Sequence, residues 1–420
     1  MHDRPIPGRG RRGWAVALAA ALLAVVAAGQ SEPRFRLPED GYDYTTISAF
    51  PGLPGLSLPE RSDADPDGRL DARAALGRVL FHDDLLSKNR RRACASCHEQ
   101  ERAFADGRAR SRGFRGRPTK RNSMSIVNLA FHDGPLFWDG RAQRLEQMVL
   151  MPIEDPIEMG LGLDELVERL SAEPGYPELF DAAFGSPEPS ASRVGDALAA
   201  FVRAITSFRS RYDAGLARVG DESKDFPNFS AAENRGKRLY FGDGRPQRSC
   251  AACHSRLRSG FCGNTAFAAG AHFESTACRN NGLDRGRRGD DPGFGAVTGQ
   301  DRDRGRFRAP SLRNVEVTGP YMHDGRFRTL EEVVAFYATG VQTHPGLDSV
   351  LRAGRSGGWG GGGLPTDVVL GGGVGPHTIT AARHGFPMSS QDQEDLVAFL
   401  KTLTDRELLE DPRFSDPFVR

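Results

Sequence analysis

The sequence has little cysteine, little tryptophan and almost no charge imbalance. Its 420 residues include 6 cysteines and 3 tryptophans, and 56 Lys and Arg against 55 Asp and Glu leave a formal net charge of +1. This balance gives no support to binding of nucleic acid or of an anionic membrane, which requires a basic surface. The basic runs Arg90 to Arg92 and Arg285 to Arg288 are interpreted as solvated surface, with docking to an acidic partner as the lesser alternative.

Long apolar runs are also rare, and the clearest one is short. It extends from Trp14 to Ala28, follows the basic residues Arg9 to Arg12 and ends in small residues at 27–29. Such a length is marginal for crossing a bilayer, whereas the order basic, apolar, small is typical of a secretory signal peptide. We therefore expect a signal peptide at residues 1–29, a periplasmic protein, and no membrane span after cleavage. An uncleaved N-terminal anchor is the alternative.

Strand-like alternation of apolar and polar residues is nearly absent, and helical spacing takes its place. Ala72, Ala75, Leu76, Val79 and Leu80 follow the three-and-four spacing of a buried helical face. The predicted helices start near Leu70 and continue at Leu163–Leu170, Pro177–Phe184, Val194–Phe208, Ala231–Tyr240, Leu330–Ala338 and Gln391–Leu403. We expect a mostly α fold with long irregular loops.

Two copies of Cys-x-x-Cys-His carry most of the chemical information. They are Cys94, Cys97 and His98, and Cys250, Cys253 and His254. In this motif the two thiols attach a haem covalently and the histidine becomes an iron ligand, which indicates two haem c groups and therefore two cytochrome c-like haem domains. A zinc knuckle or a redox dithiol is the alternative for a bare Cys-x-x-Cys, but two complete motifs in an exported chain favour haem.

Two cysteines, Cys262 and Cys278, remain outside the haem motifs. In an oxidising compartment we expect them to form a disulfide just downstream of the second motif. Two unrelated buried thiols are the alternative.

The chain divides into units that repeat one order of elements. After an extended arm at residues 30–67, we expect an N-terminal haem domain at 68–222, a C-terminal haem domain at 223–410 and a tail at 411–420. Each domain has a helix, a haem motif and later helices, which indicates an internal duplication. The polar segment Leu216 to Phe229 is predicted to be the linker, and Ser230 with Glu233 forms a capping-box pattern at the next helix. The segment Gly354 to Gly375 is predicted to be a surface loop.

Further motifs follow in a fixed order. They are Phe137-Trp138-Asp139-Gly140-Arg141, Pro152, Glu158-Met159-Gly160, Pro310-Ser311-Leu312-Arg313-Asn314 and Pro320-Tyr321-Met322-His323-Asp324-Gly325. Together with the haem motifs they resemble the bacterial dihaem cytochrome c peroxidase and MauG superfamily, over roughly residues 70–403. The resemblance implies a peroxide-binding, high-spin N-terminal haem on His98 and a low-spin, electron-transfer C-terminal haem on His254.

In the peroxidase branch of this family, a histidine in the loop before the tryptophan blocks the N-terminal iron until the enzyme is reduced. This chain has no histidine between Phe104 and Asn122. His132 is the nearest and is interpreted as a turn or surface residue, with iron ligation as the lesser alternative. The resemblance therefore implies that hydrogen peroxide needs no gating step.

The C-terminal haem ligand separates the branches. Fourteen residues after His323, where the peroxidases have Met and MauG has Tyr, this chain has Tyr337. Tyrosinate favours ferric and higher oxidation states, so Tyr337 as a ligand favours the MauG-like branch, which includes MbnH-like dihaem enzymes. The alternative is that Tyr337 is a core residue and that Met322 or His323 is the ligand.

The resemblance also assigns catalytic roles. Glu158 is expected to move a proton in the peroxide pocket, Pro152 to form a wall of that pocket, and Trp138 to relay electrons between the haems. A helix cap for Glu158 and a packing role for Trp138 are the alternatives. Two positions depart from MauG: Met148 replaces a distal Gln, and Arg248 replaces a Trp on the electron exit route.

Three further positions match calcium ligands of the family. Asn122 would supply a side-chain oxygen, and Thr318 and Pro320 backbone carbonyls, to a calcium ion between the domains.

The sequence therefore predicts a periplasmic dihaem oxidoreductase that uses hydrogen peroxide to oxidise its haems and then a protein partner at long range. A small copper-binding protein is the favoured class of partner. The alternatives are a cytochrome c peroxidase that takes electrons from a small cytochrome c or a cupredoxin, and a non-enzymatic dihaem electron carrier.

Overall fold

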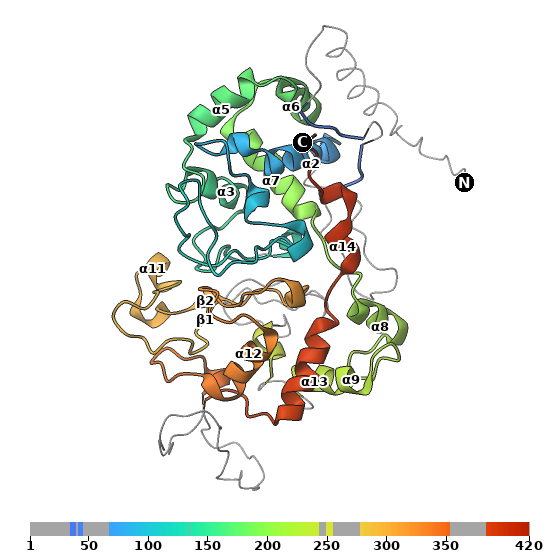
Figure 1. Cartoon of the computed structure of the whole chain (residues 1–420), viewed down its shortest axis with the longest axis vertical. Coiled ribbons are helices and arrows are strands. Elements are labelled where there is room, and N and C mark those ends of the chain that lie inside the picture. Colours follow the sequence, from blue (N-terminus) through green and yellow to red (C-terminus); the bar gives the residue numbers. More distant parts are fainter. Residues whose placement is uncertain are drawn as a thin grey trace, which may run out of the picture.

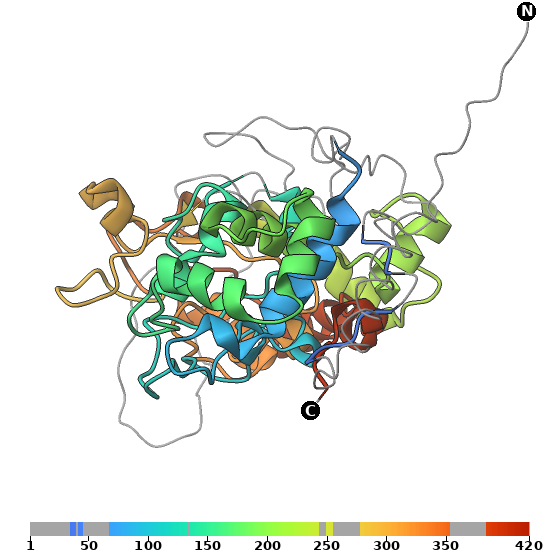
Figure 2. The ribbon, with the colours of Figure 1, turned by 90° about the horizontal axis from the view of Figure 1, so that it is seen from above.

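The computed structural model describes residues 34–38, 41–44, 67–132, 134–242, 249–254, 278–352 and 384–419. In these ranges the protein is mostly helical, as predicted, and its one sheet has two antiparallel strands, β1 (Cys278–Arg279) and β2 (Phe307–Arg308). Figure 1 shows two bodies stacked along the long axis of the molecule. Figure 2 looks down on the first body and shows the short helix α11 (Gly295–Thr298) projecting from the side.

Each body is built from helices joined by long irregular segments. The first body contains α2 (Leu70–His82), α3 (Leu145–Met148), α4 (Met151–Glu154), α5 (Leu163–Ala172), α6 (Tyr176–Phe184) and α7 (Ala191–Ala204). The second contains α8 (Arg211–Val219), α9 (Ala231–Phe241), α10 (Ala251–His254), α11, α12 (Leu330–Ala335) and α13 (Ser390–Lys401), and α14 (Arg406–Glu410) follows. Short 3₁₀ turns lie at Asp84–Leu86, Cys94–Ser96, Gln100–Arg102, Leu129–Phe131, Asp301–Asp303, Val315–Val317, Ser349–Leu351 and Pro412–Phe414.

One close helix pair forms the centre of each body. In the first, a Cβ added to Gly77 of α2 would lie 2.0 Å from the carbonyl oxygen of Ala197 in α7. In the second, a Cβ added to Gly236 of α9 would lie 1.9 Å from the carbonyl oxygen of Asp395 in α13. The absence of a side chain thus lets two backbones touch at equivalent places, each on the helix that precedes a haem motif.

A second repeated feature is a turn centred on an asparagine. Asn128 and Asn314 both have left-handed backbones, with φ of 62° and 61°, and each starts a 3₁₀ turn. The side-chain oxygen of Asn128 accepts a hydrogen bond from the Ser207 N–H, just after α7, at 2.8 Å. The side-chain oxygen of Asn314 accepts one from the Asp405 N–H, just after α13, at 2.8 Å. These shared details support the internal duplication.

Several predicted element bounds need correction. The predicted linker Leu216 to Phe229 begins inside α8, which is capped by a Ser210–Asp213 capping box and packs through Tyr212 into the second core. The predicted helix Val194–Phe208 ends at Ala204, and Leu330–Ala338 divides into α12 and a π-helical turn at Phe336–Gly340. The capping box of Ser230 and Glu233 is confirmed.

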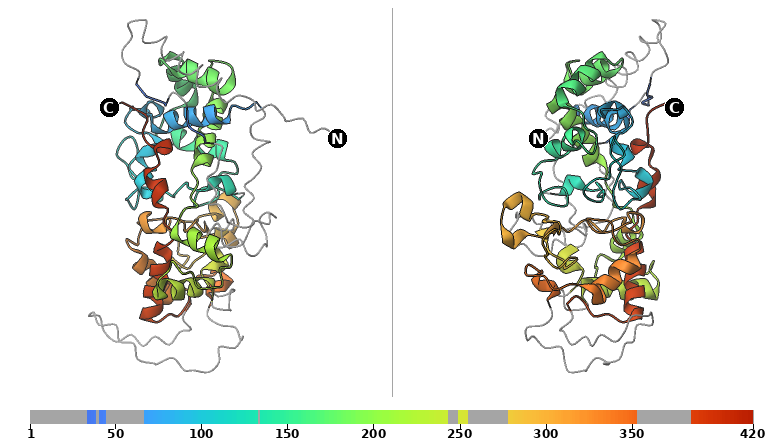
Figure 3. Two further views of the ribbon diagram at one scale, coloured as in Figure 1. Left: turned by 90° about the vertical axis from the view of Figure 1, so that its right-hand side faces the viewer. Right: turned by 60° about the vertical axis from the view of Figure 1, so that its left-hand side comes forward.

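The described segments at residues 34–44 and 408–419 pack on the first body. Phe35 of the predicted arm pairs with Phe418, and the Tyr44 hydroxyl donates to the Arg413 carbonyl oxygen at 3.1 Å. Leu408 and Phe414 are buried in the first hydrophobic core, although they follow α13 of the second body. Figure 3 shows α14 and the C-terminal end returning along the molecule to the first body. The arm and the tail therefore contribute to the core.

We expect Gly236→Ala to lower the Tm. Alanine gains about 1 kcal/mol in helix propensity, but its Cβ would meet backbone, and overpacking of this kind costs ~1–3 kcal/mol or more. Gly162→Ala is the control, since a Cβ there has nothing within 4 Å. Thermal unfolding followed by circular dichroism measures both variants, and an unchanged Tm for Gly236→Ala would contradict the close contact.

Candidate active site

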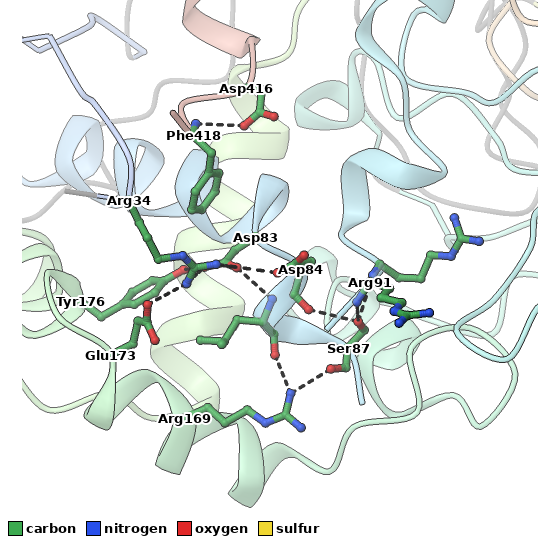
Figure 4. A network of polar contacts seen from close by, with 12 residues as sticks. Arg34, Asp83, Asp84, Ser87, Arg91, Arg169, Glu173, Tyr176, Asp416 and Phe418 are labelled. Carbon is green, nitrogen blue, oxygen red and sulfur yellow. Dashed lines mark hydrogen bonds and ion pairs between the residues drawn. The ribbon is translucent and has the colours of Figure 1, made fainter. Parts of the chain in front are cut away.

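The first haem motif follows a segment held by a network of polar contacts. Asp83 receives hydrogen bonds from the Tyr176 hydroxyl, at 2.7 Å, and from the Arg34 guanidinium, as Figure 4 shows. Arg169 donates to the carbonyl oxygens of Leu85 and Ser87, at 2.9 and 2.8 Å. The Ser87 hydroxyl in turn accepts from two backbone N–H groups that lead into the motif. The segment before Cys94 is thereby fixed.

His98 is oriented for metal binding. Its Nδ1 lies 2.7 Å from the carbonyl oxygen of Phe104, so this nitrogen donates and Nε2 is left as the acceptor. Burial lowers the pKa of His98, which keeps the ring neutral, as a metal ligand must be. A carbonyl partner of this kind is the usual support of a ligating histidine.

The first cavity fits a covalently held haem. It has a volume of about 330 Å³, and its wall carries Cys94, Cys97 and His98 together with many apolar side chains. Trp138, Met148, Pro152 and Glu158 line the same cavity. In the part of the chain that the structure describes, His98 is the one histidine on this wall. His132 lies elsewhere, with its Nε2 3.1 Å from the Pro135 carbonyl oxygen.

Glu158 carries a half-buried carboxyl group. Burial, with a further contribution from the charge of Asp155 and against that of Arg141, raises the pKa of Glu158 to about 7. Its backbone is fixed, because its N–H donates to Asp155 Oδ1 at 3.1 Å and its carbonyl oxygen accepts from the Phe114 N–H at 2.8 Å. Its carboxylate caps no helix in the described ranges, so a proton-transfer role suits it better than the structural alternative.

Trp138 lies between the two cavities and lines both. Its indole Nε1 donates to the Asn122 carbonyl oxygen at 2.9 Å, and its own carbonyl oxygen accepts from the Arg308 N–H at 2.8 Å. Trp138 is therefore held from both bodies, its indole by Asn122 and its backbone by Arg308. Its role as an electron relay stays a prediction.

The second haem motif forms the short helix α10. The Nδ1 of His254 lies 3.0 Å from the carbonyl oxygen of Pro310, which repeats the arrangement at His98. The cavity above it measures about 190 Å³ and is lined by Cys250, Cys253, His254 and Tyr337. The donor set and the apolar wall again fit a covalent haem.

All three candidates for the second iron ligand on this side line the second cavity: Tyr337, Met322 and His323. Asn281 Nδ2 lies 3.2 Å from the Tyr337 hydroxyl oxygen and 3.6 Å from the Met322 sulfur. The His323 ring stacks on Phe307, with 3.7 Å between centroids and 11° between planes. Tyr337 itself sits on the π-helical turn, a distortion that is frequent at functional sites.

Sequence reasoning missed Asn281. Its amide is oriented because the Leu283 N–H donates to its Oδ1, at 3.2 Å, which leaves Nδ2 to donate to Tyr337. The Asn280-Asn281-Gly282 run is a turn signature that could have drawn attention to this segment. Its contact with Tyr337 joins positions 56 residues apart and has no local signal.

The predicted calcium ligands come together. Asn122 from the first body and Thr318 and Pro320 from the second line the same cavity. Asn122 Nδ2 donates to the Arg108 carbonyl oxygen at 2.9 Å, which leaves Oδ1 as the oxygen that could face an ion. Among the described residues there is no group of three or more His, Cys, Asp or Glu side chains that could hold a metal. The calcium site stays a prediction.

Two predicted features lie outside the described residues: Cys262 of the expected disulfide and Arg248 on the expected exit route. Signal residues 1–29 and the loop Gly354 to Gly375 also lie outside them.

Comparison with known proteins identifies the family. Residues 71–221 match the family model described as di-haem cytochrome c peroxidase. The methylamine utilization protein MauG of Methylorubrum extorquens is 35% identical over 338 residues, 79% of this chain and 78% of that protein. Cytochrome-c peroxidase IdrP1 of Denitromonas iodatirespirans is 33% identical, covering 71% of this chain and 80% of the relative.

A solved structure agrees with these relatives. The crystal structure of a MauG-like protein associated with microbial copper homeostasis superposes with a TM-score of 0.62 at 35% identity, and covers 82% of this chain and 93% of that one. The chain belongs to the dihaem cytochrome c peroxidase and MauG family. It is an oxidoreductase of the dihaem peroxidase type with two c-type haems. Its relatives include MauG proteins and a MauG-like protein of known structure, which supports the MauG-like branch of the family. No helix in the described ranges has the length and apolar character needed to cross a membrane.

Glu158→Gln should slow the reaction with hydrogen peroxide by roughly 10²–10⁴-fold, the usual contribution of a positioned acid–base group. Because the carboxylate must accept the first proton, the wild-type rate should rise with pH through about 7, the pKa of Glu158, and then level off. The variant should lack this rise. Stopped-flow absorption across pH measures it, with exposed Glu154→Gln as the control. A pH profile that survives in Glu158→Gln would assign the proton transfer to another group.

Tyr337→Phe should change the ferric absorption and EPR spectra of the low-spin haem and raise its midpoint potential, because an anionic oxygen ligand is lost. Met322→Leu, in the same cavity, should leave the ferric spectrum as it is. The reverse pattern, with an effect of Met322→Leu and none of Tyr337→Phe, would make Met322 the ligand.

Proposed function

We propose that this protein is a periplasmic enzyme of the MauG-like branch that uses hydrogen peroxide to oxidise a protein partner at long range. One observation supports this most: in the described residues, the first cavity has a single histidine, His98, and a half-buried carboxyl group, Glu158, with a raised pKa. With His98 as the one described histidine on this cavity wall, an iron bound there would have no second histidine ligand, and peroxide could bind in its place. The cavity also has the group that peroxide cleavage requires.

In this proposal each residue has a separate task. His98 and His254 hold the two haems, which when bound supply the iron that exchanges electrons with peroxide. Glu158 accepts a proton from the inner oxygen of bound peroxide and delivers it to the outer oxygen, and Pro152 forms the adjacent wall. Trp138 carries an electron between the two cavities that it lines.

The second site favours the MauG-like branch over simple peroxide removal. Tyr337 lines the same cavity as the second haem motif, and the Asn281 amide donates to its hydroxyl oxygen. Burial raises the pKa of Tyr337, and the hydrogen bond from Asn281 opposes this by favouring the anionic form, which is the form that stabilises oxidised iron. A calcium ion on Asn122, Thr318 and Pro320 would join the bodies beside this site.

The protein partner is proposed by likeness. MauG acts in methylamine utilization, and the similar solved structure is associated with copper homeostasis. A small exported copper-binding protein is therefore the favoured partner.

The packing of the helices also supports two haem domains. Because α8 packs into the second hydrophobic core, the proposed boundary between the domains lies before Arg211 rather than at residue 222.

Adding hydrogen peroxide to the fully ferric protein tests this proposal. We expect an immediate reaction without any prior reduction and a long-lived near-infrared absorption band, because the oxidising equivalents are shared across Trp138. Trp138→Phe should lose the band while both haems stay attached. A wild-type protein that is inert until it is partly reduced would instead be a gated cytochrome c peroxidase.

A further inference from the structure

Tyr321 occupies a boundary between the second haem cavity and the outside. A cleft of about 750 Å³ lies between the two bodies, with walls from both, at residues 101–109 and 316–328. Pro320 and Tyr321 are the two residues that line both this cleft and the second haem cavity. Any route from the cleft to that cavity through these walls therefore passes one of them.

The phenol is held firmly in this place. The Tyr321 backbone N–H donates to the Phe327 carbonyl oxygen at 2.7 Å, which closes the turn of the Pro-Tyr-Met-His-Asp-Gly motif. The Tyr321 hydroxyl donates to the Val315 carbonyl oxygen at 2.8 Å. The side chain packs against the second hydrophobic core and is partly exposed. One face thus belongs to the protein interior and another to the cleft.

Chemistry sets Tyr321 apart from the other residues of the cleft. These are Glu101, Arg102, Gly107, Ala109, Glu316, Val317, Gly319, Pro320, Gly325 and Arg328. None of them has a side chain that strong oxidants readily oxidise, whereas a phenol loses one electron and one proton to become a stable radical. In the inner part of the molecule, Trp138 has the same property and the same kind of place, between two cavities.

We propose that Tyr321 is the residue through which electrons enter from the protein partner, docked at this cleft. The inference rests on the proposed function, and it supplies the exit route for the oxidising equivalents. The cleft has two acidic side chains, Glu101 and Glu316, and two basic ones, Arg102 and Arg328; they come from both bodies and give it no net charge. The partner is therefore a redox-active protein with a polar, nearly neutral contact surface.

The steps balance as follows. Tyr321 gives one electron to the oxidised second haem site, and its phenolic proton leaves the hydrogen bond to the Val315 carbonyl oxygen and passes to solvent water. The partner then returns one electron, water returns the proton, and the phenol is restored. Two such passages supply the two electrons with which one hydrogen peroxide and two protons become two water molecules, while the partner loses two electrons.

Tyr321→Phe tests the route, because phenylalanine keeps the ring and its packing but is not oxidised under these conditions. Tyr44→Phe is the matched control: Tyr44 is buried in the first body and its hydroxyl also donates to a backbone carbonyl, that of Arg413. Reduced cytochrome c serves as a macromolecular donor that cannot enter the cavities. The haem-loaded protein is mixed with hydrogen peroxide, and both haem absorption and cytochrome c oxidation are followed by stopped flow.

We expect Tyr321→Phe to lower the rate of cytochrome c oxidation, relative to the rate of the peroxide reaction, by roughly tenfold or more, and Tyr44→Phe to leave this ratio unchanged. In wild-type protein without donor, a spin-trap adduct at Tyr321 should appear by peptide mass spectrometry. An unchanged ratio in Tyr321→Phe and no adduct at Tyr321 would overturn the route. A wild-type protein that never reacts with peroxide would instead overturn the proposed function.

Discussion

The arrangement of both sites depends on a buried ion-pair cluster between the two bodies. Arg121 binds Asp139 of the first body and, through two nitrogens at 2.8 Å, both carboxylate oxygens of Asp291 in the second. Burial alone would raise the pKa of Asp291, but the hydrogen bonds and charge of Arg121 lower it to about 2, so the cluster stays charged at neutral pH. Removing one partner of such a buried pair costs ~3–5 kcal/mol. Asn122 and Trp138, which adjoin Arg121 and Asp139 in the chain, are thereby placed between the cavities.

An internal duplication accounts for the structural features that the two bodies share, and later substitutions account for the different side chains in their cavities. The two bodies share the glycine contact between paired helices, the asparagine turn, the proximal histidine with its carbonyl partner, and a turn in which Phe137 and Met322 both have positive φ. At the next position of that turn, however, Trp138 corresponds to His323. Each cavity also received its own polar group, Glu158 in the first and Tyr337 in the second. Equal scaffolds thus hold unequal sites.

Much of this could be predicted from sequence because the signals are local. Two pentapeptides predict six haem-binding residues, each of which lines one of the two cavities. Helical periodicity locates α2, α5, α6 and α9, and Ser230 with Glu233 marks a helix start. The predictions that were wrong concern places where contacts between residues far apart in the chain decide the structure. The helical continuation of α7 stops at Ala204 because the following residues hydrogen-bond Asn128, and the residues from Phe336 form a π turn that carries Tyr337 in the cavity wall.

The same reason explains what the sequence did not reveal at the site. The cleft beside Tyr321, the contact of Asn281 with Tyr337 and the return of the C-terminal segment to the first core each join residues far apart in the chain.

The two haem sites are expected to differ in the ligation and spin state of their irons, and EPR of the fully ferric protein tests this difference most directly. One high-spin signal and one low-spin signal of equal amount are expected. Two low-spin signals, with no high-spin haem, would contradict the account.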